Sequence, residues 1–190
     1  MQIVIKFTGS APLVLHSDRT ANPIDPAAKA IKKLSSKRVK TDADHEEIAR
    51  IEHAAGIYFD PDIGPYVPGA NFFRCLTDAA RITKAGKKIE RGLLIVSNVN
   101  PLAYPGPRTL DGLWEDESYR LVAAVKIGKA KTMRCRPIFR EWRTECQAML
   151  DRSILGLDEL GAIVEQAGSM VGLGDWRPLY GRFTGEVVRA

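Results

Sequence analysis

The residues best suited to chemistry lie in a glycine-rich segment near the end of the chain, at 168–183. Aromatic rings, guanidinium groups and glycines alternate there: Trp176, Tyr180, Arg177, Arg182, Gly172 and Gly174. Arginine forks onto phosphate oxygens and stacks on flat rings, and an aromatic ring offers a nucleic-acid base a stacking surface. Glycine permits a positive φ and close approach of backbone or ligand. A binding loop and a tight helix-to-strand turn whose rings complete the core both fit this pattern, and the segment alone leaves the two interpretations open.

A second candidate segment, 126–143, is strongly cationic. It contains one acid, Glu141, and seven basic residues: Lys126, Lys129, Lys131, Arg134, Arg136, Arg140 and Arg143. In an extended strand Arg134 and Arg136 point to one face, whereas Met133 and Cys135 point to the other. We therefore expect the second face to pack and the arginine face to bind a polyanion, and Lys126 and Lys131 are also predicted to contribute to binding. Pairing of these arginines with the acidic loop 111–117 is the alternative.

Composition bounds the class of protein. With 190 residues, 45% hydrophobic and 27% charged, the chain suits one globular domain. Three widely separated cysteines and three histidines form no metal-binding spacing, so we expect no metal, no cofactor and no disulfide framework. No apolar run reaches bilayer length and the first residues do not resemble a signal peptide. The expectation is a cytoplasmic protein with no membrane partner.

Periodicity predicts an α+β protein. Alternation indicates strands over 1–8, 93–97, 142–150 and 183–188 and a hairpin over about 119–140. Helical spacing indicates helices over 70–83 and 157–167, the second ending with Gly168 at the C′ position. We expect a polar connection at 84–91 and a long irregular loop at 98–117. The order reduces to a ferredoxin-like, RRM-like βαββαβ core with an inserted hairpin.

Residues 16–65 are predicted to form a helical insertion. A short helix over 27–34 precedes a better one that begins at Thr41 or Asp42 and ends at Gly56. The run 29–40 is cationic and without acids, which is typical of a solvated face and also compatible with phosphate binding. His45 and His53 are expected to be solvated. Such an insertion is a candidate lid or partner contact.

Two motifs together resemble a known family. Pro65-Tyr66-Val67-Pro68-Gly69, followed directly by a helix, is similar to the "PYIPGSSLKGALR" signature of the RAMP superfamily, the ferredoxin-like RNA-binding subunits of type I and type III CRISPR effector complexes. The segment 172–182 resembles the C-terminal glycine-rich loop of that family. The resemblance implies one RAMP-like domain over 1–190, with 119–140 as a thumb that folds over the guide. The chain looks like the small solitary members of phage and prophage genomes.

The chain departs from the family pattern at three positions. Phe73 and Arg74 replace the usual Lys and Gly in the motif helix, and Phe183 stands where a second loop glycine is expected. The helix is therefore expected to pack rather than touch RNA.

The functional prediction is a non-catalytic protein that binds single-stranded nucleic acid, RNA rather than DNA, and self-associates along the strand. No local arrangement holds a general base beside a proton, so no catalytic residue is assigned. One alternative is a phage anti-CRISPR or decoy module that binds CRISPR effector subunits. A weaker alternative is an endoribonuclease that uses His16, although a surface histidine is the simpler interpretation of that residue.

Overall fold

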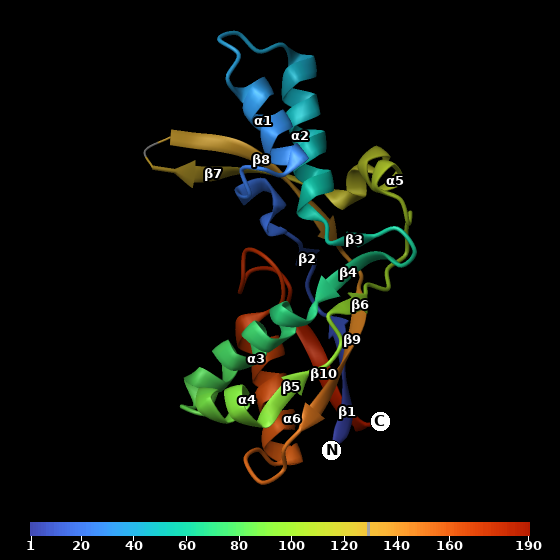
Figure 1. The fold of residues 1–190 in the computed structure, drawn as a ribbon, viewed down its shortest axis with the longest axis vertical. Coiled ribbons are helices and arrows are strands. Elements are labelled where there is room, and N and C mark those ends of the chain that lie inside the picture. The colour runs from blue at the N-terminus through green and yellow to red at the C-terminus, as the bar shows by residue number, and fades with distance from the viewer. Residues whose placement is uncertain (129) are drawn as a thin grey trace. The chain divides into compact units, whose positions relative to one another are not determined.

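A computed structural model describes residues 1–128 and 130–190, so Lys129 of the cationic segment lies outside the described residues (Figure 1). The chain divides into two compact units. Unit 1 contains 1–14, 59–105 and 139–190, and unit 2 contains 15–58 and 106–138. Most of the predicted insertion and most of the predicted hairpin fall in unit 2, whereas the predicted core elements make up unit 1.

Unit 1 contains the ferredoxin-like core that the sequence predicts. Its main elements are β1 (Gln2–Gly9), α3 (Gly69–Ile82), β5 (Leu93–Ile95), β9 (Arg143–Leu150), α6 (Leu157–Gln166) and β10 (Phe183–Arg189). The four strands form one sheet in the order β10-β1-β9-β5, and every neighbouring pair is antiparallel. This order interleaves two βαβ units, which confirms the α+β, ferredoxin-like prediction.

The two faces of this sheet differ in burial. Along β1 the residues Ile3, Ile5 and Phe7 are buried, while Gln2, Lys6 and Thr8 between them are exposed. The Phe7 ring lies 4.7 Å from that of Phe72 on α3 and 5.0 Å from that of Phe183 on β10. Burying each such ring stabilises the fold by about 1.5–3 kcal/mol. The helices therefore cover one face, and the other face remains open.

Smaller elements of unit 1 correct two predictions. They are β2 (Leu13–Val14), β3 (Phe59–Asp60), β4 (Gly64–Pro68), α4 (Gly86–Gly92) and β6 (Val99–Pro101). Helix α4 occupies most of the predicted polar connection at 84–91, and its apolar residue Ile89 is fully buried. Strand β6 lies within the predicted irregular loop. This segment is extended because it pairs with β4, and the buried Asn100 side chain donates to the carbonyl of Val67 at 2.9 Å.

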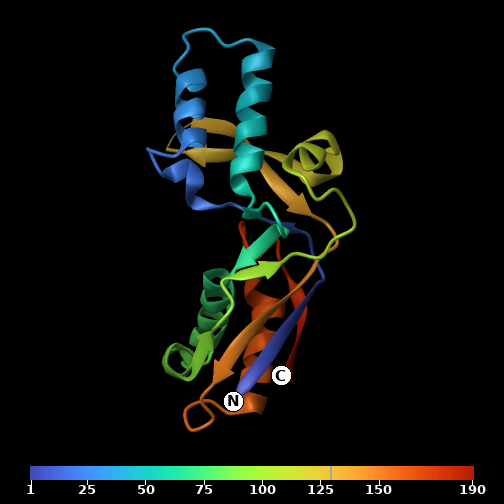
Figure 2. The same cartoon turned by 45° about the vertical axis from the view of Figure 1, so that its right-hand side comes forward.

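Unit 2 combines three α-helices with a β-hairpin among its described residues. Its elements are a 3₁₀ turn η1 (Asp18–Ala21), α1 (Pro26–Ser35), α2 (Asp42–Gly56), α5 (Leu110–Glu115), a second 3₁₀ turn η2 (Glu117–Tyr119), β7 (Arg120–Ile127) and all but the last residue of β8 (Ala130–Phe139). Helices α1 and α2 lie side by side in both views (Figure 1 and Figure 2). Among the described residues, no helix has both the length and the apolar character that crossing a bilayer demands.

Helix α2 begins as predicted but buries an unexpected residue. The Thr41 side chain accepts from the Asp44 backbone N–H and the Asp44 carboxylate accepts from that of Thr41, which completes a capping box. His53 is fully buried, so the prediction of a solvated histidine is wrong. Its Nε2 lies 3.0 Å from the Tyr119 carbonyl, and burial lowers the pKa of the imidazole to about 4.

Candidate nucleic-acid interface

The candidate loop follows a π-helical turn (Ala167–Val171) that extends α6. Gly168 lies inside this turn, so the prediction that it occupies the C′ position is wrong. Gly172 ends the turn instead, with φ at +83°, a conformation that glycine adopts without a Cβ clash. Its N–H donates to the Ala167 carbonyl at 2.8 Å.

Backbone hydrogen bonds hold both ends of the loop. Leu173 donates to the Gly181 carbonyl at 2.8 Å, and Asp175 donates to that of Val14 at 2.8 Å. Gly181 in turn donates to the carbonyl of Pro12 at 2.7 Å. These bonds leave 176–180 as a tip, closed by a 3.3 Å bond from the Tyr180 N–H to the Trp176 carbonyl. The loop is therefore anchored to the segment that follows β1.

A buried thiol lies beneath the loop. Cys75 of α3 donates its S–H to the Gly172 carbonyl at 3.1 Å. Burial raises the pKa of this thiol to about 12, and the nearby Arg177 only partly opposes that shift. Cys75 therefore stays protonated near neutral pH and joins helix to loop rather than acting as a nucleophile.

The two rings of the tip are not sealed in the core. Trp176 and Tyr180 are each half-buried, and their ring centroids are 6.1 Å apart with the planes tilted by 49°. Trp176 also has φ at +52°, which is uncommon for a bulky residue. Residues held in such backbone conformations are concentrated at ligand-binding and active sites. The second interpretation of this segment, a turn whose rings complete the core, is therefore not what the structure contains.

Arg177 belongs to a cluster of arginines around one carboxylate. Asp78 on α3 accepts from Arg74 Nε at 2.8 Å and from an Arg81 NH group at 3.3 Å. The Arg177 guanidinium lies 3.6 Å from the same carboxylate. Arg81 also donates to Glu90 at 3.2 Å. Three guanidinium groups therefore meet two carboxylates, and a third carboxylate, that of Asp175, lies in the adjoining loop.

The other predicted arginine of the loop has a structural role. Arg182 Nε donates to the carbonyl of Pro178 at 2.8 Å, and a second nitrogen of the same guanidinium donates to that of Ser169. Arg182 therefore links the tip to the π-helical turn through these two hydrogen bonds. The prediction that it holds phosphate has no support in this geometry.

In unit 2 the hairpin matches the predicted arrangement only in part, because Cys135 is buried as expected but the arginines are not exposed. Arg134 pairs with Glu52 of α2, a residue only 4% exposed, and Glu52 also accepts from the Cys135 N–H at 3.1 Å. Arg136 is buried. Met133 is 60% exposed on the opposite face. A buried carboxylate therefore draws the arginine face inward, and the predicted row of exposed guanidinium groups is wrong.

The predicted alternative, pairing with the acidic loop 111–117, is also wrong for Arg134. That loop pairs with other arginines of unit 2, since Arg50 lies 2.9 Å from Asp111 and Arg120 lies 2.9 Å from Glu117.

Lysines provide much of the exposed positive charge of unit 2, alongside exposed arginines such as Arg38. Lys126 and Lys131 are exposed and face each other across the hairpin register. On the helical side, Lys29, Lys32 and Lys33 are exposed along α1 and follow the spacing of one helical face. These groups remain candidates for phosphate contacts.

The open face of the unit 1 sheet carries no aromatic ring among the described strands. Its outward positions include Lys6 of β1, which lies across from Glu145 on β9 and Glu186 on β10. RRM domains bind RNA by stacking bases on rings at such a face. The described strands offer no ring for that mode, and the half-exposed rings near the arginine cluster of unit 1 lie instead at the loop tip and at Phe73 of α3.

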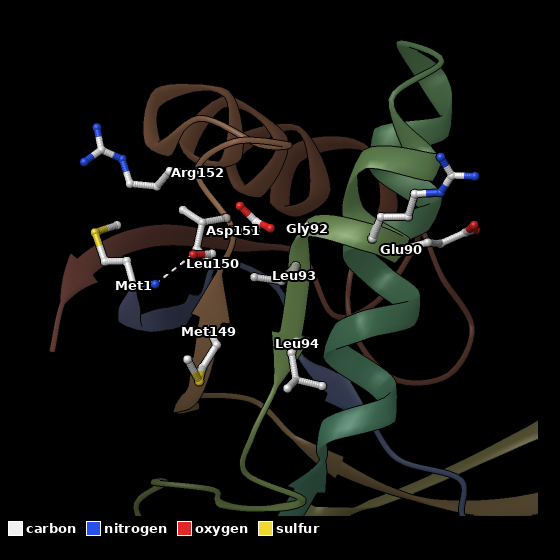
Figure 3. Close-up of a pocket in the computed structure, with 10 residues that line it drawn as sticks. Met1, Glu90, Gly92, Leu93, Leu94, Met149, Leu150, Asp151 and Arg152 are labelled. Carbon is white, nitrogen blue, oxygen red and sulfur yellow. Dashed lines mark hydrogen bonds between the residues drawn. The ribbon is translucent and has the colours of Figure 1, made fainter.

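A hollow of about 570 Å³ lies at the end of β5 and β9, away from the glycine-rich loop (Figure 3). The Met1 ammonium donates to the Leu150 carbonyl at 2.9 Å, and the charges around the hollow alternate in sign. Leu94 is 63% exposed and faces Met149 across the strand register. This hollow suits an apolar contact better than a polyanion.

The fold and this site together define the class: an α+β, ferredoxin-like fold with an anchored glycine-rich loop. A solved structure with a similar fold is "Cryo-EM structure of the Type III-B Cmr-beta bound to cognate target RNA", in which one chain matches with a TM-score of 0.50 and 10% identity. The match covers 99% of this chain and 60% of that chain, so this chain spans about 60% of its neighbour's length. No family model and no curated protein matches the sequence.

The arginine cluster on α3 was missed by the sequence reasoning, although part of its signal was visible. Arg74 and Asp78 are four residues apart, and Asp78 and Arg81 are three apart, which is the spacing of neighbours on a helix surface. The contribution of Arg177 had no such signal, because the loop meets α3 only in the folded chain.

Proposed function

We propose that this protein binds single-stranded nucleic acid, RNA in preference to DNA, without catalysing a reaction on it. The observation that carries the proposal is the arginine cluster of Arg74, Arg81 and Arg177 beside the half-exposed rings of Trp176 and Tyr180. Arginine pairs with phosphate, and an exposed ring accepts a base in a sequence-tolerant way. The solved neighbour is one chain of a complex that is bound to its cognate target RNA, which supports RNA over DNA.

The exposed lysines of unit 2 are assigned the supporting electrostatic role. Lys126 and Lys131 are too few to specify a sequence, but each phosphate that they neutralise releases counterions. With four phosphate contacts in total, the logarithm of the affinity is expected to fall with the logarithm of the salt concentration with a slope of about −3 for a single strand. Self-association along the strand, as in a multi-subunit backbone, is part of the proposal.

Fluorescence anisotropy with a 30-nucleotide single-stranded RNA, the matching DNA and a duplex RNA at two salt concentrations tests the proposal. The triple variant Arg74→Gln/Arg81→Gln/Arg177→Gln is expected to bind RNA at least 30-fold more weakly, with a salt slope that is shallower by about 1.4 because two of the four phosphate contacts, those of Arg74 and Arg81, are lost. The double variant Arg152→Gln/Arg189→Gln removes exposed charge elsewhere in unit 1 and is the control. Absent or salt-independent binding by the natural sequence contradicts the proposal.

A protein-interaction module that binds CRISPR effector subunits is the second candidate. The observation that favours it is the exposed apolar pair Leu94 and Met149 beside the hollow at the end of β5, which nucleic-acid binding does not use. Capture of purified effector subunits that persists after nuclease treatment, and that Leu94→Ser abolishes, supports this candidate. Capture that nuclease removes supports RNA binding instead.

The endoribonuclease alternative is tested separately. Incubation with end-labelled RNA is expected to leave the strand intact. Cleavage by the natural sequence that disappears in His16→Ala contradicts the non-catalytic proposal.

A further inference from the structure

A pocket of about 530 Å³ lies beside the tip of the loop in unit 1. Its walls come from α3, from the π-helical turn and from the loop, and they include Asp78, Met170, Asp175, Trp176 and Arg177. This volume lies within the range of small-molecule sites, about 300–1,000 Å³, and exceeds what a single bound water requires. The pocket is wide open to solvent and is large enough to hold one nucleobase against its wall.

The apolar part of the wall suits a flat ring. Trp176 is half-buried and Met170 is 57% exposed, so an indole and a thioether both border the pocket. Indole rings stack on bases, and methionine sulfur adapts to an aromatic surface.

The polar part of the wall offers both donors and acceptors. Among the three arginines around Asp78, Arg177 has the longest separation, 3.6 Å against 2.8 and 3.3 Å, so its guanidinium is the one most readily shared with a ligand. A guanidinium has five N–H donors, and a carboxylate has about four acceptor sites. Asp175 and Asp78 add carboxylates, which disfavour a phosphate inside the pocket.

Guanine matches this combination better than the other bases. Its O6 and N7 accept from an arginine, and its N1–H and N2 amino group donate to a carboxylate. Uracil presents two carbonyl oxygens and one N–H, so it would set an acceptor against a carboxylate.

We infer that this pocket receives one guanine base turned out of the bound single strand, with the ring against Trp176, the carbonyl edge toward Arg177 and the amino edge toward Asp175. The inference rests on the proposed nucleic-acid binding and adds base selectivity to it. The phosphates flanking that nucleotide then lie outside the pocket, toward Arg74 and Arg81.

Twelve-nucleotide oligouridine with one central substitution tests the inference by fluorescence anisotropy. A central guanosine is expected to bind about 10-fold more tightly than uridine, whereas an abasic centre binds no more tightly than uridine. Equal affinity for strands with different central nucleotides contradicts the assignment of the pocket to guanine. It leaves the proposed function intact, because oligouridine itself still binds. Adenosine or cytidine bound more tightly than guanosine also overturns it.

Two variants separate the pocket from general binding. Asp175→Asn keeps the size of the side chain and the backbone bond to Val14, and is expected to reduce the preference for guanosine to less than 3-fold with oligouridine affinity unchanged or raised. Leu179→Ala, an exposed position of the same tip that does not border the pocket, is the matched control and is expected to retain the preference. A preference that survives Asp175→Asn contradicts the assignment of the amino edge.

If no strand binds, the proposed function fails, and a nucleotide titration still decides the pocket. Guanosine 5′-monophosphate is expected to quench tryptophan fluorescence more strongly than uridine 5′-monophosphate, in a Trp114→Phe background that leaves Trp176 as the half-buried indole. No difference between the two nucleotides overturns the inference.

Discussion

Both units contain arginines grouped around an acid, but they differ in where that acid lies. In unit 1 Asp78 is partly exposed on α3, and three guanidinium groups surround it at the surface beside the loop tip. In unit 2 Glu52 is buried, and Arg134 turns inward to meet it. Unit 2 holds 15 basic and 11 acidic residues and unit 1 holds 13 and 12, so unit 2 has the larger net charge. The depth of the partner carboxylate, rather than the number of cations, decides which arginines remain available to a ligand.

The comparison predicts that Glu52 matters for stability and Asp78 for binding. Glu52→Ala leaves Arg134 half-buried without its partner and removes the acceptor of the Cys135 N–H, so the free energy of unfolding is expected to fall by about 3–5 kcal/mol. Urea denaturation measures this change. Glu47→Ala, an exposed position of the same helix, is the control and is expected to change stability by less than about 0.5 kcal/mol. Equal stability of the two variants would contradict an inward-facing arginine strand.

The second prediction concerns acid and again separates the units. The pKa of His53 is about 4 in the folded state and its ordinary value is 6.5, so the unfolded chain binds the proton more tightly. The contribution of neutral His53 to the free energy of unfolding is therefore fully present above pH 6.5. It is lost as the pH falls toward 4, by up to about 3 kcal/mol. Denaturation at pH 7.5 and 4.5 measures the loss, and His53→Phe, which fills the same space without a titratable group, is expected to remove most of it. An unchanged pH dependence in that variant would show that other groups dominate.

The third prediction concerns the surface cluster of unit 1. Arg74→Gln/Arg177→Gln is expected to weaken RNA binding by about 10–30-fold, since one charge-assisted contact to a phosphate and one to a base are lost and each contributes about 1 kcal/mol or more. Stability is expected to change little, because ion pairs at the surface contribute about 0–1 kcal/mol. Anisotropy and thermal melting of the same sample measure the two effects. A loss of unfolding free energy larger than the loss of binding free energy would show that this cluster stabilises the fold, as the Arg134–Glu52 pair of unit 2 is expected to do.

The fourth and smallest effect is expected at the hairpin of unit 2. Lys126→Gln/Lys131→Gln is expected to weaken RNA binding by about 3–10-fold and to make the salt slope shallower by about 1.4, because exposed lysines act as point charges on phosphate. Arg134→Gln offers the contrast: it is expected to lower stability first. If Arg134→Gln weakens binding more than the lysine variant in a folded sample, the assignment of the two faces is incorrect.

Local pattern predicted much of the fold. Strands β1, β9 and β10 and helix α3 have strong periodicity, and their bounds lie close to the predicted ones. Helix α4 was missed because Ile89 is the only large apolar residue among its charged neighbours. Strand β6 was missed because its signal is the pairing with β4, which lies more than 30 residues earlier in the chain.

The candidate site was less predictable than the fold. The rings of the loop were identified by residue type alone. The exposure of Arg134 and Arg136 was predicted wrongly, because both faces of the hairpin contain apolar and basic residues and the deciding acid, Glu52, lies 82 residues before Arg134 in the chain. Arg182 was assigned to phosphate because nothing in its neighbours indicates that two backbone carbonyls occupy its guanidinium.

The backbone bonds that anchor the loop have a consequence for how such a protein changes its ligand. The contacts from Leu173, Asp175 and Gly181 use main-chain atoms, and Gly174, with φ at +80°, completes a frame in which side chains at 176–180 take little part. Substitutions at the tip are therefore expected to change the stability of the fold little. The same backbone framework can then carry a different set of side chains at 176–180. Diversification among proteins of this shape is expected to concentrate in those few positions while the frame around them stays constant.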